Sequence, residues 1–161
     1  MIIRSLLQKD RQGIRRLIEQ RGTFNEAEIE VALELLEEAL RHPDESEYRF
    51  LCATHMQNEL AGYVCFGPIP MTEHCYDLYW IVVDIACSRQ GVGKRLLVEM
   101  EDRLRGVNAR RIYIDTSSTQ AYAAARSFYG KNGYRPVCVL DDFYRKDDHK
   151  IIFVKEFKNT V

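Results

Sequence analysis

The stretch "VVDIACSRQGVGKRLL", Val82–Leu97, predicts a strand, a turn with two glycines and the start of a helix. Gly91 and Gly93 stand one residue apart, with Arg89 and Lys94 beside them. A helix N-terminus carries unpaired N–H groups and a partial positive charge, and glycines let a ligand approach the backbone closely. The turn therefore predicts an anion site suited to a phosphate, although a plain tight turn with solvated basic side chains has the same pattern.

Two common phosphate-binding motifs do not fit this turn. A P-loop needs G-x-x-x-x-G-K-[ST], but Ser88 occupies the first glycine position and Arg95 follows Lys94. A dinucleotide-binding turn needs G-x-G-x-x-G, but Leu96 occupies the third glycine position and the turn does not follow the first predicted strand. The sequence therefore argues against both kinds of nucleotide site.

Length, composition and charge favour one globular domain over residues 1–161. The chain is 46% hydrophobic and 29% charged, as in ordinary soluble proteins. Its 23 Lys and Arg residues against 24 Asp and Glu residues give a net charge of −1, which argues against a general nucleic-acid binder.

The sequence also predicts a cytoplasmic protein with no membrane and no metal partner. The start, "MIIRSLLQKD", is charged too early for a signal peptide, and no apolar run approaches the ~18 residues of a membrane helix. The five cysteines lack C-x-x-C spacing, and the four histidines are dispersed without metal-ligand spacing. We therefore expect reduced thiols in the cytoplasm.

Hydrophobic periodicity predicts the element order β-α-α-β-β-β-α-β-α-β-β. Thr23 and Glu26 have capping-box spacing before the second helix, and the segment "DDFYRKDDH" (141–149) is expected to be a loop between the two last strands. Strand–helix–strand units in the second half imply parallel pairing there, whereas the hairpin-like first half implies antiparallel strands. The predicted fold is α/β, with a mixed, mostly antiparallel sheet and helices on both faces.

Two stretches resemble motifs of the GNAT N-acetyltransferase superfamily. "IVVDIACSRQGVGKRLL" (81–97) is similar to motif A, [QR]-x-x-G-x-[GA] after a strand, and "ARSFYGKNGYRPV" (125–137) is similar to motif B, A-x-x-F-Y-x-x-x-G-[FY]. The resemblance extends from about Tyr76 to Phe157 and implies the acyl-CoA N-acyltransferase fold. Ser88 stands where the family usually has Gln or Arg, and Tyr122 stands where many members have an Asn that contacts the cofactor.

The resemblance implies acetyl-CoA as the acetyl donor. Its pantetheine arm would pair with the backbone of Ile81, Val82 and Val83, where two strands splay apart in this family. Its pyrophosphate would lie on the amides of the turn, which belong to Arg89, Gln90, Gly91, Val92, Gly93 and Lys94.

Acetyl transfer to an amine needs a base and benefits from an acid. An alkylamine with a pKa near ~10.4 is protonated at neutral pH, and a thiolate of pKa ~8.5 leaves more easily when protonated. Tyr129 matches the motif B tyrosine and is the candidate acid, the alternative being a packed aromatic residue. Asp77 and Asp115 are both candidate bases, the alternative for each being a solubilising strand charge. Strand alternation is expected to place Asp77 on one face with Tyr79, Ile81 and Val83.

These features together predict an N-acetyltransferase that transfers the acetyl group directly in a ternary complex. No cysteine has the surroundings of a nucleophile, which argues against a covalent acetyl-enzyme. The acceptor is expected to be a small-molecule or peptide amine, and a homodimer is left open. The alternative from another class is a non-catalytic acetyl-CoA-binding sensor.

Overall fold

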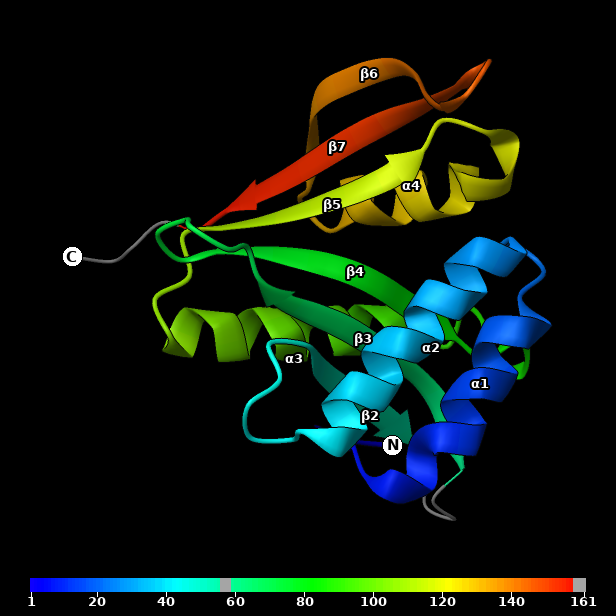
Figure 1. Ribbon diagram of the computed structural model, residues 1–161, viewed down its shortest axis with the longest axis vertical. Coiled ribbons are helices and arrows are strands. Elements are labelled where there is room, and N and C mark those ends of the chain that lie inside the picture. The colour runs from blue at the N-terminus through cyan, green and yellow to red at the C-terminus, as the bar shows by residue number, and fades with distance from the viewer. Residues whose placement is uncertain (56–58, 158–161) are drawn as a thin grey trace.

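The computed structural model describes residues 1–55 and 59–157, which form one seven-stranded sheet with helices on both faces (Figure 1). The strands are β1 (Ile2–Ser5), β2 (Arg49–Thr54), β3 (Leu60–Pro68), β4 (Cys75–Val83), β5 (Arg111–Ser117), β6 (Arg135–Arg145) and β7 (Asp148–Glu156). The helices are α1 (Arg11–Gln20), α2 (Glu26–Arg41), α3 (Val92–Gly106) and α4 (Ala123–Lys131), with short 3₁₀ turns η1 (Gln8–Asp10), η2 (Ile85–Cys87) and η3 (Gln120–Tyr122).

The sheet order is β1-β2-β3-β4-β5-β7-β6, and β4–β5 is the one parallel pair among the described strands. The element order and the mixed, mostly antiparallel sheet predicted from the sequence are thus confirmed. The polar turn expected between β2 and β3 lies partly outside the described residues. Within the described ranges, no helix has the length and apolar character needed to cross a membrane.

Two hydrophobic cores hold the helices against the sheet. Under α1 and α2 the core includes Ile14, Leu17 and Leu36, each at most 1% exposed. Under α3 and α4 it includes Leu96 and Met100, both fully buried. Burying an aliphatic side chain contributes about 1.5–3 kcal/mol to the stability of the folded protein. The predicted apolar helix faces therefore hold the helices against the sheet.

The N-cap of helix α2 lies two residues later than predicted. Asn25 is the N-cap: its side chain accepts a hydrogen bond from the Glu28 amide at 2.9 Å, and Glu28 Oε2 accepts from the Asn25 amide at 2.8 Å. The expected capping box at Thr23 and Glu26 is therefore wrong, because Asn25 and Glu28 have the same spacing and lie where the helix starts.

A β-bulge in β4 divides that strand between the two cores. Cys65 of β3 pairs with Trp80, but the next residue of β3 pairs with Leu78, so Tyr79 is an extra residue. As a result Tyr79, like Trp80, packs under α1 and α2, whereas Ile81 packs under α3. The expectation that simple alternation places Asp77 and Tyr79 on one face with Ile81 and Val83 is wrong, because a bulge shifts the side-chain period by one residue.

Strands β4 and β5 stay together only at one end. They pair at three positions, Cys75 with Arg111, Tyr76 with Ile112 and Asp77 with Tyr113. Beyond these positions the two strands diverge, and the sheet opens into two halves (Figure 1). The backbone of β4 beyond Asp77 is therefore not paired with β5.

The last two strands form a longer hairpin than the sequence suggests. Strand β6 continues to Arg145 and β7 starts at Asp148, so only two residues connect them. The segment 141–149 is therefore mostly strand, and its prediction as a loop is wrong. Acidic residues favour a loop, but Phe143 and Tyr144 favour a strand, and Asp142 takes a positive φ of 49° where the register is irregular.

Candidate active site

The glycine turn ends β4 and starts α3 with a free helix N-terminus. The Asp84 side chain accepts a hydrogen bond from the Ala86 amide at 2.9 Å and holds the turn η2. Arg89 and Gly91 both have positive φ values, 62° and 78°, and Gly91 is the helix N-cap. No described side chain caps α3, so the amides at its start remain available to an anion.

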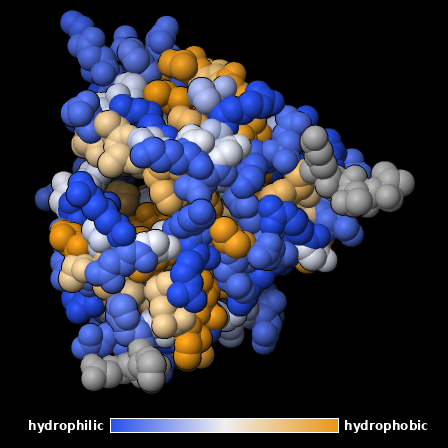
Figure 2. Space-filling model, turned by 180° about the vertical axis from the view of Figure 1, so that it is seen from behind, coloured by the Kyte–Doolittle hydropathy of each residue, from blue (hydrophilic) through white to orange (hydrophobic). Residues whose placement is uncertain are grey.

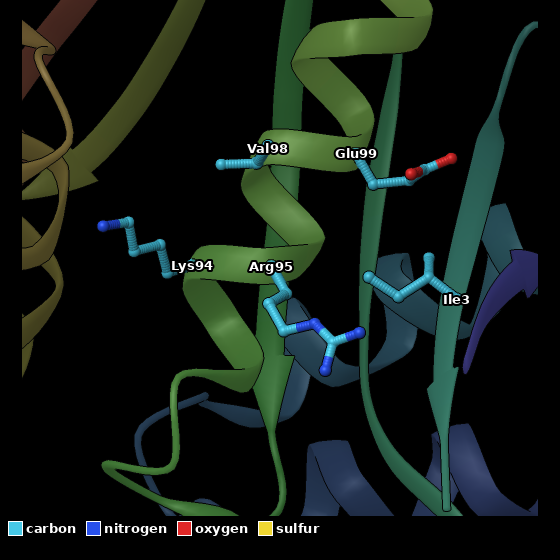
Figure 3. Close-up of a pocket in the computed structure, with 5 residues that line it drawn as sticks. All are labelled: Ile3, Lys94, Arg95, Val98 and Glu99. Atoms are coloured by element: carbon cyan, nitrogen blue, oxygen red, sulfur yellow. The ribbon is translucent and has the colours of Figure 1, made fainter. Parts of the chain in front are cut away.

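Basic side chains flank this turn without all facing it. In Figure 3, Lys94 and Arg95 point in different directions from the first turn of α3. Arg95 donates a hydrogen bond to the Met1 carbonyl at 3.2 Å and so is directed toward the start of the chain. Arg89 and Lys94 are exposed, which leaves both able to approach a bound phosphate.

A shallow hollow of about 360 Å³ lies beside this first turn (Figure 3). Its lining residues are Ile3, Lys94, Arg95, Val98 and Glu99. None of them comes from β4, β5 or α4, which carry the candidate acid and bases. We therefore do not assign the reaction to this hollow.

The end of β4 from Ile81 to Val83 lies beyond the last position at which β4 pairs with β5. Figure 2, which views the molecule from behind, shows a hollow at its left. Ile81 and Val83 face this side and pack against the core under α3, whereas Val82 is buried under α1 and α2. Because only β3 pairs with this part of β4, backbone groups on the other edge of β4 face the gap.

Tyr129 lies on α4, on the same side of the sheet as the glycine turn. Its ring contacts those of Phe128, Tyr134 and Phe153 at centroid distances of 5.7, 6.2 and 6.0 Å. The side chain is only 7% exposed, and burial raises its pKa well above the usual value. Its hydroxyl has no hydrogen-bond partner among the described residues, unlike that of Tyr134, which donates to Glu101 at 3.0 Å.

Asp77 and Asp115 lie on the opposite side of the sheet, toward α1 and α2. Their neighbours along the strands, such as Leu78 and Ile114, pack under α3 and α4, so the two carboxylates point the other way. The pKa of Asp77 is raised to about 6, first by burial and then by the Asp115 carboxylate, whereas Lys150 lowers it. Lys150 Nζ donates a hydrogen bond to Asp115 Oδ2 at 2.7 Å, so Asp115 is paired with a positive charge. Asp77 forms no such direct pair with Lys150.

Tyr122 spans the open end of the gap. Its hydroxyl donates a hydrogen bond to Glu28 Oε1 at 2.8 Å, which joins the corner between β5 and α4 to the start of α2. Burial, followed by this hydrogen bond, raises the pKa of Tyr122. The side chain that stands at the position of the family's asparagine is thus directed toward α2.

The structure brings the predicted residues together in two groups, one on each side of the gap. The turn, the end of β4 and Tyr129 lie on the α3 and α4 side, whereas Asp77 and Asp115 lie on the α1 and α2 side. Sequence reasoning missed Glu28 and Lys150. Both meet their partners across long sequence separations, and no local pattern could have paired them. In the described ranges, no group of three or more metal-ligating side chains comes together.

The seven-stranded sheet with strands that diverge between β4 and β5 is shared with solved acetyltransferase structures. Residues 12–134 match the sequence profile described as "Acetyltransferase (GNAT) family". A GNAT-family protein from Desulfovibrio desulfuricans is similar over 96% of this chain and 98% of its own, with 39% identity and a TM-score of 0.89. The chain belongs to the acetyltransferase (GNAT) family.

More distant structures share the fold. An aminoglycoside 6'-N-acetyltransferase complexed with coenzyme A has 20% identity and a TM-score of 0.74, with 97% of each chain covered. The ribosomal-protein-S18-alanine N-acetyltransferase from Escherichia coli has 18% identity and a TM-score of 0.76, covering 99% of this chain and 97% of its own. No curated protein matches the chain.

Proposed function

We propose that the protein transfers the acetyl group of acetyl-CoA to a primary amine, directly and within a ternary complex. The observation that carries this proposal is the divergence of β4 from β5, because the glycine turn lies on one face of the sheet and the two carboxylates lie on the other. Donor and acceptor could then enter from opposite faces and meet in the gap. Free-thiol release from acetyl-CoA, measured against a panel of amines, tests the activity, and a panel without any turnover would favour the sensor alternative.

The donor side fits a coenzyme A thioester. The free amides from Gly91 to Lys94 would hold the pyrophosphate, with Arg89 adding charge. The unpaired edge of β4 at Ile81–Val83 would hydrogen-bond the pantetheine arm, and one of its amides would stabilise the oxyanion. The related fold that was solved with coenzyme A supports this choice of donor.

The acceptor side fits a cationic amine. Asp77 is the better base of the two candidates, because Asp115 is paired with Lys150 while the pKa of Asp77, about 6, leaves it ionised and basic at neutral pH. Asp77 would take a proton from the amine, directly or through water. The amine nitrogen would then attack the thioester carbonyl. As the C–S bond breaks, Tyr129 would protonate the departing thiolate, and the second proton on the nitrogen would pass to the Tyr129 phenolate or to water. The particular acceptor, the homodimer and the cytoplasmic location stay predictions.

The donor site is tested by placing a charge at Gly91. We expect Gly91→Asp to weaken CoA binding by at least about tenfold, or ~1.4 kcal/mol, because a carboxylate would stand where the pyrophosphate must lie. A Cβ at this position meets no other atom within 4 Å, so the substitution does not crowd the fold. Calorimetric titration with CoA measures the effect.

Gly91→Asn is the matched control for that variant. It has nearly the same size and the same tolerance of the positive φ as Asp, but no charge. We expect it to retain most of the CoA affinity. Equal losses in the two variants would mean that backbone strain, rather than charge, causes the effect, and unchanged affinity in a folded Gly91→Asp variant would contradict the proposed site.

The hydrogen bond between Tyr122 and Glu28 is tested by its effect on the KM for the acceptor. We expect Tyr122→Phe to raise the KM for the acceptor several-fold, in line with ~1 kcal/mol for a hydrogen bond, because the start of α2 would no longer be held beside the gap. CoA affinity should be unchanged, since the hydroxyl is directed toward α2. Glu28→Gln keeps an acceptor oxygen and serves as the conservative control. A loss of CoA affinity with no change in acceptor KM would contradict this assignment.

A further inference from the structure

Thr116 carries a buried polar atom that the fold leaves unsatisfied. Its side chain is 5% exposed, and its Oγ1 is the one fully enclosed side-chain nitrogen or oxygen in residues 1–55 and 59–157 that has no hydrogen-bond partner. Buried hydroxyl groups in native proteins nearly always have a partner, and one without a partner lowers the stability of the fold. Valine has almost the same shape as threonine and lacks this cost, so the hydroxyl calls for a role.

The next three hydroxyl groups along the chain are satisfied. Ser117 Oγ donates a hydrogen bond to the buried carboxylate of Asp148 at 2.5 Å. Ser118 Oγ accepts a hydrogen bond from the His149 amide at 2.9 Å, and Thr119 Oγ1 shares one with Ser117 Oγ at 2.8 Å. The fold thus supplies partners to three successive hydroxyl groups at this end of β5 but not to the one before them.

Thr116 faces the side of the sheet that carries α3 and α4. Its cross-strand neighbour is Ile151, which packs against the core under those helices. Ile114, two residues earlier on the same face of β5, belongs to that core, and so does Tyr129. The unsatisfied hydroxyl therefore lies on the side of the sheet on which the donor is proposed to bind.

Along β5, Thr116 lies beyond the point at which this strand leaves β4. The last pair between the two strands is Asp77 with Tyr113, and Thr116 is three residues further along β5. When the extra residue of the β4 bulge is counted, the same advance along β4 reaches Ile81. Thr116 is therefore about level with the start of the segment Ile81–Val83, along which the pantetheine arm is proposed to lie.

We propose that the Thr116 hydroxyl hydrogen-bonds an amide group of the pantetheine arm of coenzyme A, which is its missing partner. A hydroxyl can donate to an amide carbonyl or accept from an amide N–H, and the arm contains both groups. The methylene groups of the arm suit the apolar side chains of this face, such as Ile114 and Ile151. Because the hydroxyl is enclosed in the free protein, the arm must move neighbouring side chains to reach it, and the contact forms only in the complex. This inference rests on the proposed function, which supplies the donor.

Removal of the hydroxyl should have opposite effects on the free protein and on the complex. We expect Thr116→Val to melt at the same or a higher temperature than the wild type, because it loses an unsatisfied polar atom and keeps the shape of the side chain. We also expect it to bind CoA about fivefold to tenfold more weakly in calorimetric titration, the scale for one hydrogen bond. Thr116→Ser keeps the hydroxyl and should retain most of the CoA affinity.

Two controls locate the effect on the pantetheine arm. Thr54→Val removes the hydroxyl of another buried threonine, which is 2% exposed and lies on β2, separated from β4 by β3. This variant should bind CoA as the wild type does. The nucleotide portion of CoA alone, without the pantetheine arm, should bind equally well to the wild type and to Thr116→Val.

Equal CoA affinity in the wild type and in Thr116→Val overturns this contact and leaves the proposed donor site in place. Equal losses for CoA and for its nucleotide portion also overturn the contact, because the substitution would then act on the glycine turn. A Thr116→Val variant that melts well below the wild type would mean that the hydroxyl has a partner in the free protein, which contradicts the proposal. A wild type that binds no CoA overturns the proposed function as well. Titration and melting need no acceptor, so failure of amine acetylation and failure of this contact are distinguishable.

Discussion

Asp77→Asn is expected to lower kcat by about 10²- to 10⁴-fold, the range for loss of a general base. The amide cannot accept the proton of the attacking amine, while the shape of the side chain is kept. CoA affinity should be nearly unchanged, because Asp77 lies on the face of the sheet opposite the glycine turn. Steady-state kinetics with the best acceptor of the amine panel, together with CoA titration, measures both effects.

The pH dependence of kcat/KM in the wild-type enzyme should report the ionisation of Asp77. The pKa of Asp77 is about 6, so kcat/KM should rise through a midpoint near pH 6 as the carboxylate becomes ionised. The acceptor amine titrates separately, near ~10. Asp115→Asn should move the lower midpoint down, because Asp115 raises the pKa of Asp77, and Lys150→Met should move it up, because Lys150 lowers that pKa. Midpoints that move in the same direction in both variants would contradict the assignment.

The thermal stability of Asp77→Asn is a control for its kinetics. Burial raises the folded-state pKa of Asp77 above its unfolded value of ~3.9, so the folded protein binds this proton more tightly than the unfolded chain does. The wild type therefore loses stability as the pH rises from ~4 through about 6. Above that range Asp77→Asn should unfold at the same or a higher temperature, which would show that the kinetic loss does not come from misfolding.

Tyr129→Phe should lower kcat by roughly 10²-fold, the scale for loss of a general acid. The substitution removes one oxygen and keeps the ring in its contacts with Phe128 and Phe153. Since the hydroxyl bonds to no described residue, the thermal stability should hardly change. Turnover and melting temperature, measured on the same preparation, separate a catalytic hydroxyl from a packed ring.

Tyr134, whose ring contacts that of Tyr129, supplies a control in which stability rather than turnover should change. Its hydroxyl donates to the buried carboxylate of Glu101, so Tyr134→Phe should cost about 1.5–3 kcal/mol of stability and leave kcat near the wild-type value. One tyrosine should thus affect turnover and the other stability. If Tyr129→Phe turns over acceptor at the wild-type rate, Tyr129 is a core aromatic and the acid lies elsewhere.

The sequence was informative where periodicity and turn chemistry decide the structure. The apolar faces of α3, the two glycines and the order of the elements depend on local patterns, and the fold agrees with them. The bulge at Tyr79 could not be predicted, because an alternating apolar strand gives no sign of one extra residue. That single residue moved Asp77 to the face opposite Ile81 and so separated the candidate base from the donor contacts. The pairing of Lys150 with Asp115 depends on strand register over 35 residues, which local patterns do not encode.

Glu28 couples the cap of helix α2 to the corner between β5 and α4. One of its carboxylate oxygens completes the cap of α2, and the other accepts the hydrogen bond from Tyr122 across the open end of the gap. The first turn of a helix frays on timescales of nanoseconds to microseconds, far faster than typical enzymatic turnover. Because both contacts use the one Glu28 carboxylate, we expect fraying at the start of α2 to release the link to Tyr122 as well. Access of an acceptor to the gap would then be in rapid equilibrium with helix fraying, and the opening of this side of the molecule would not limit the rate.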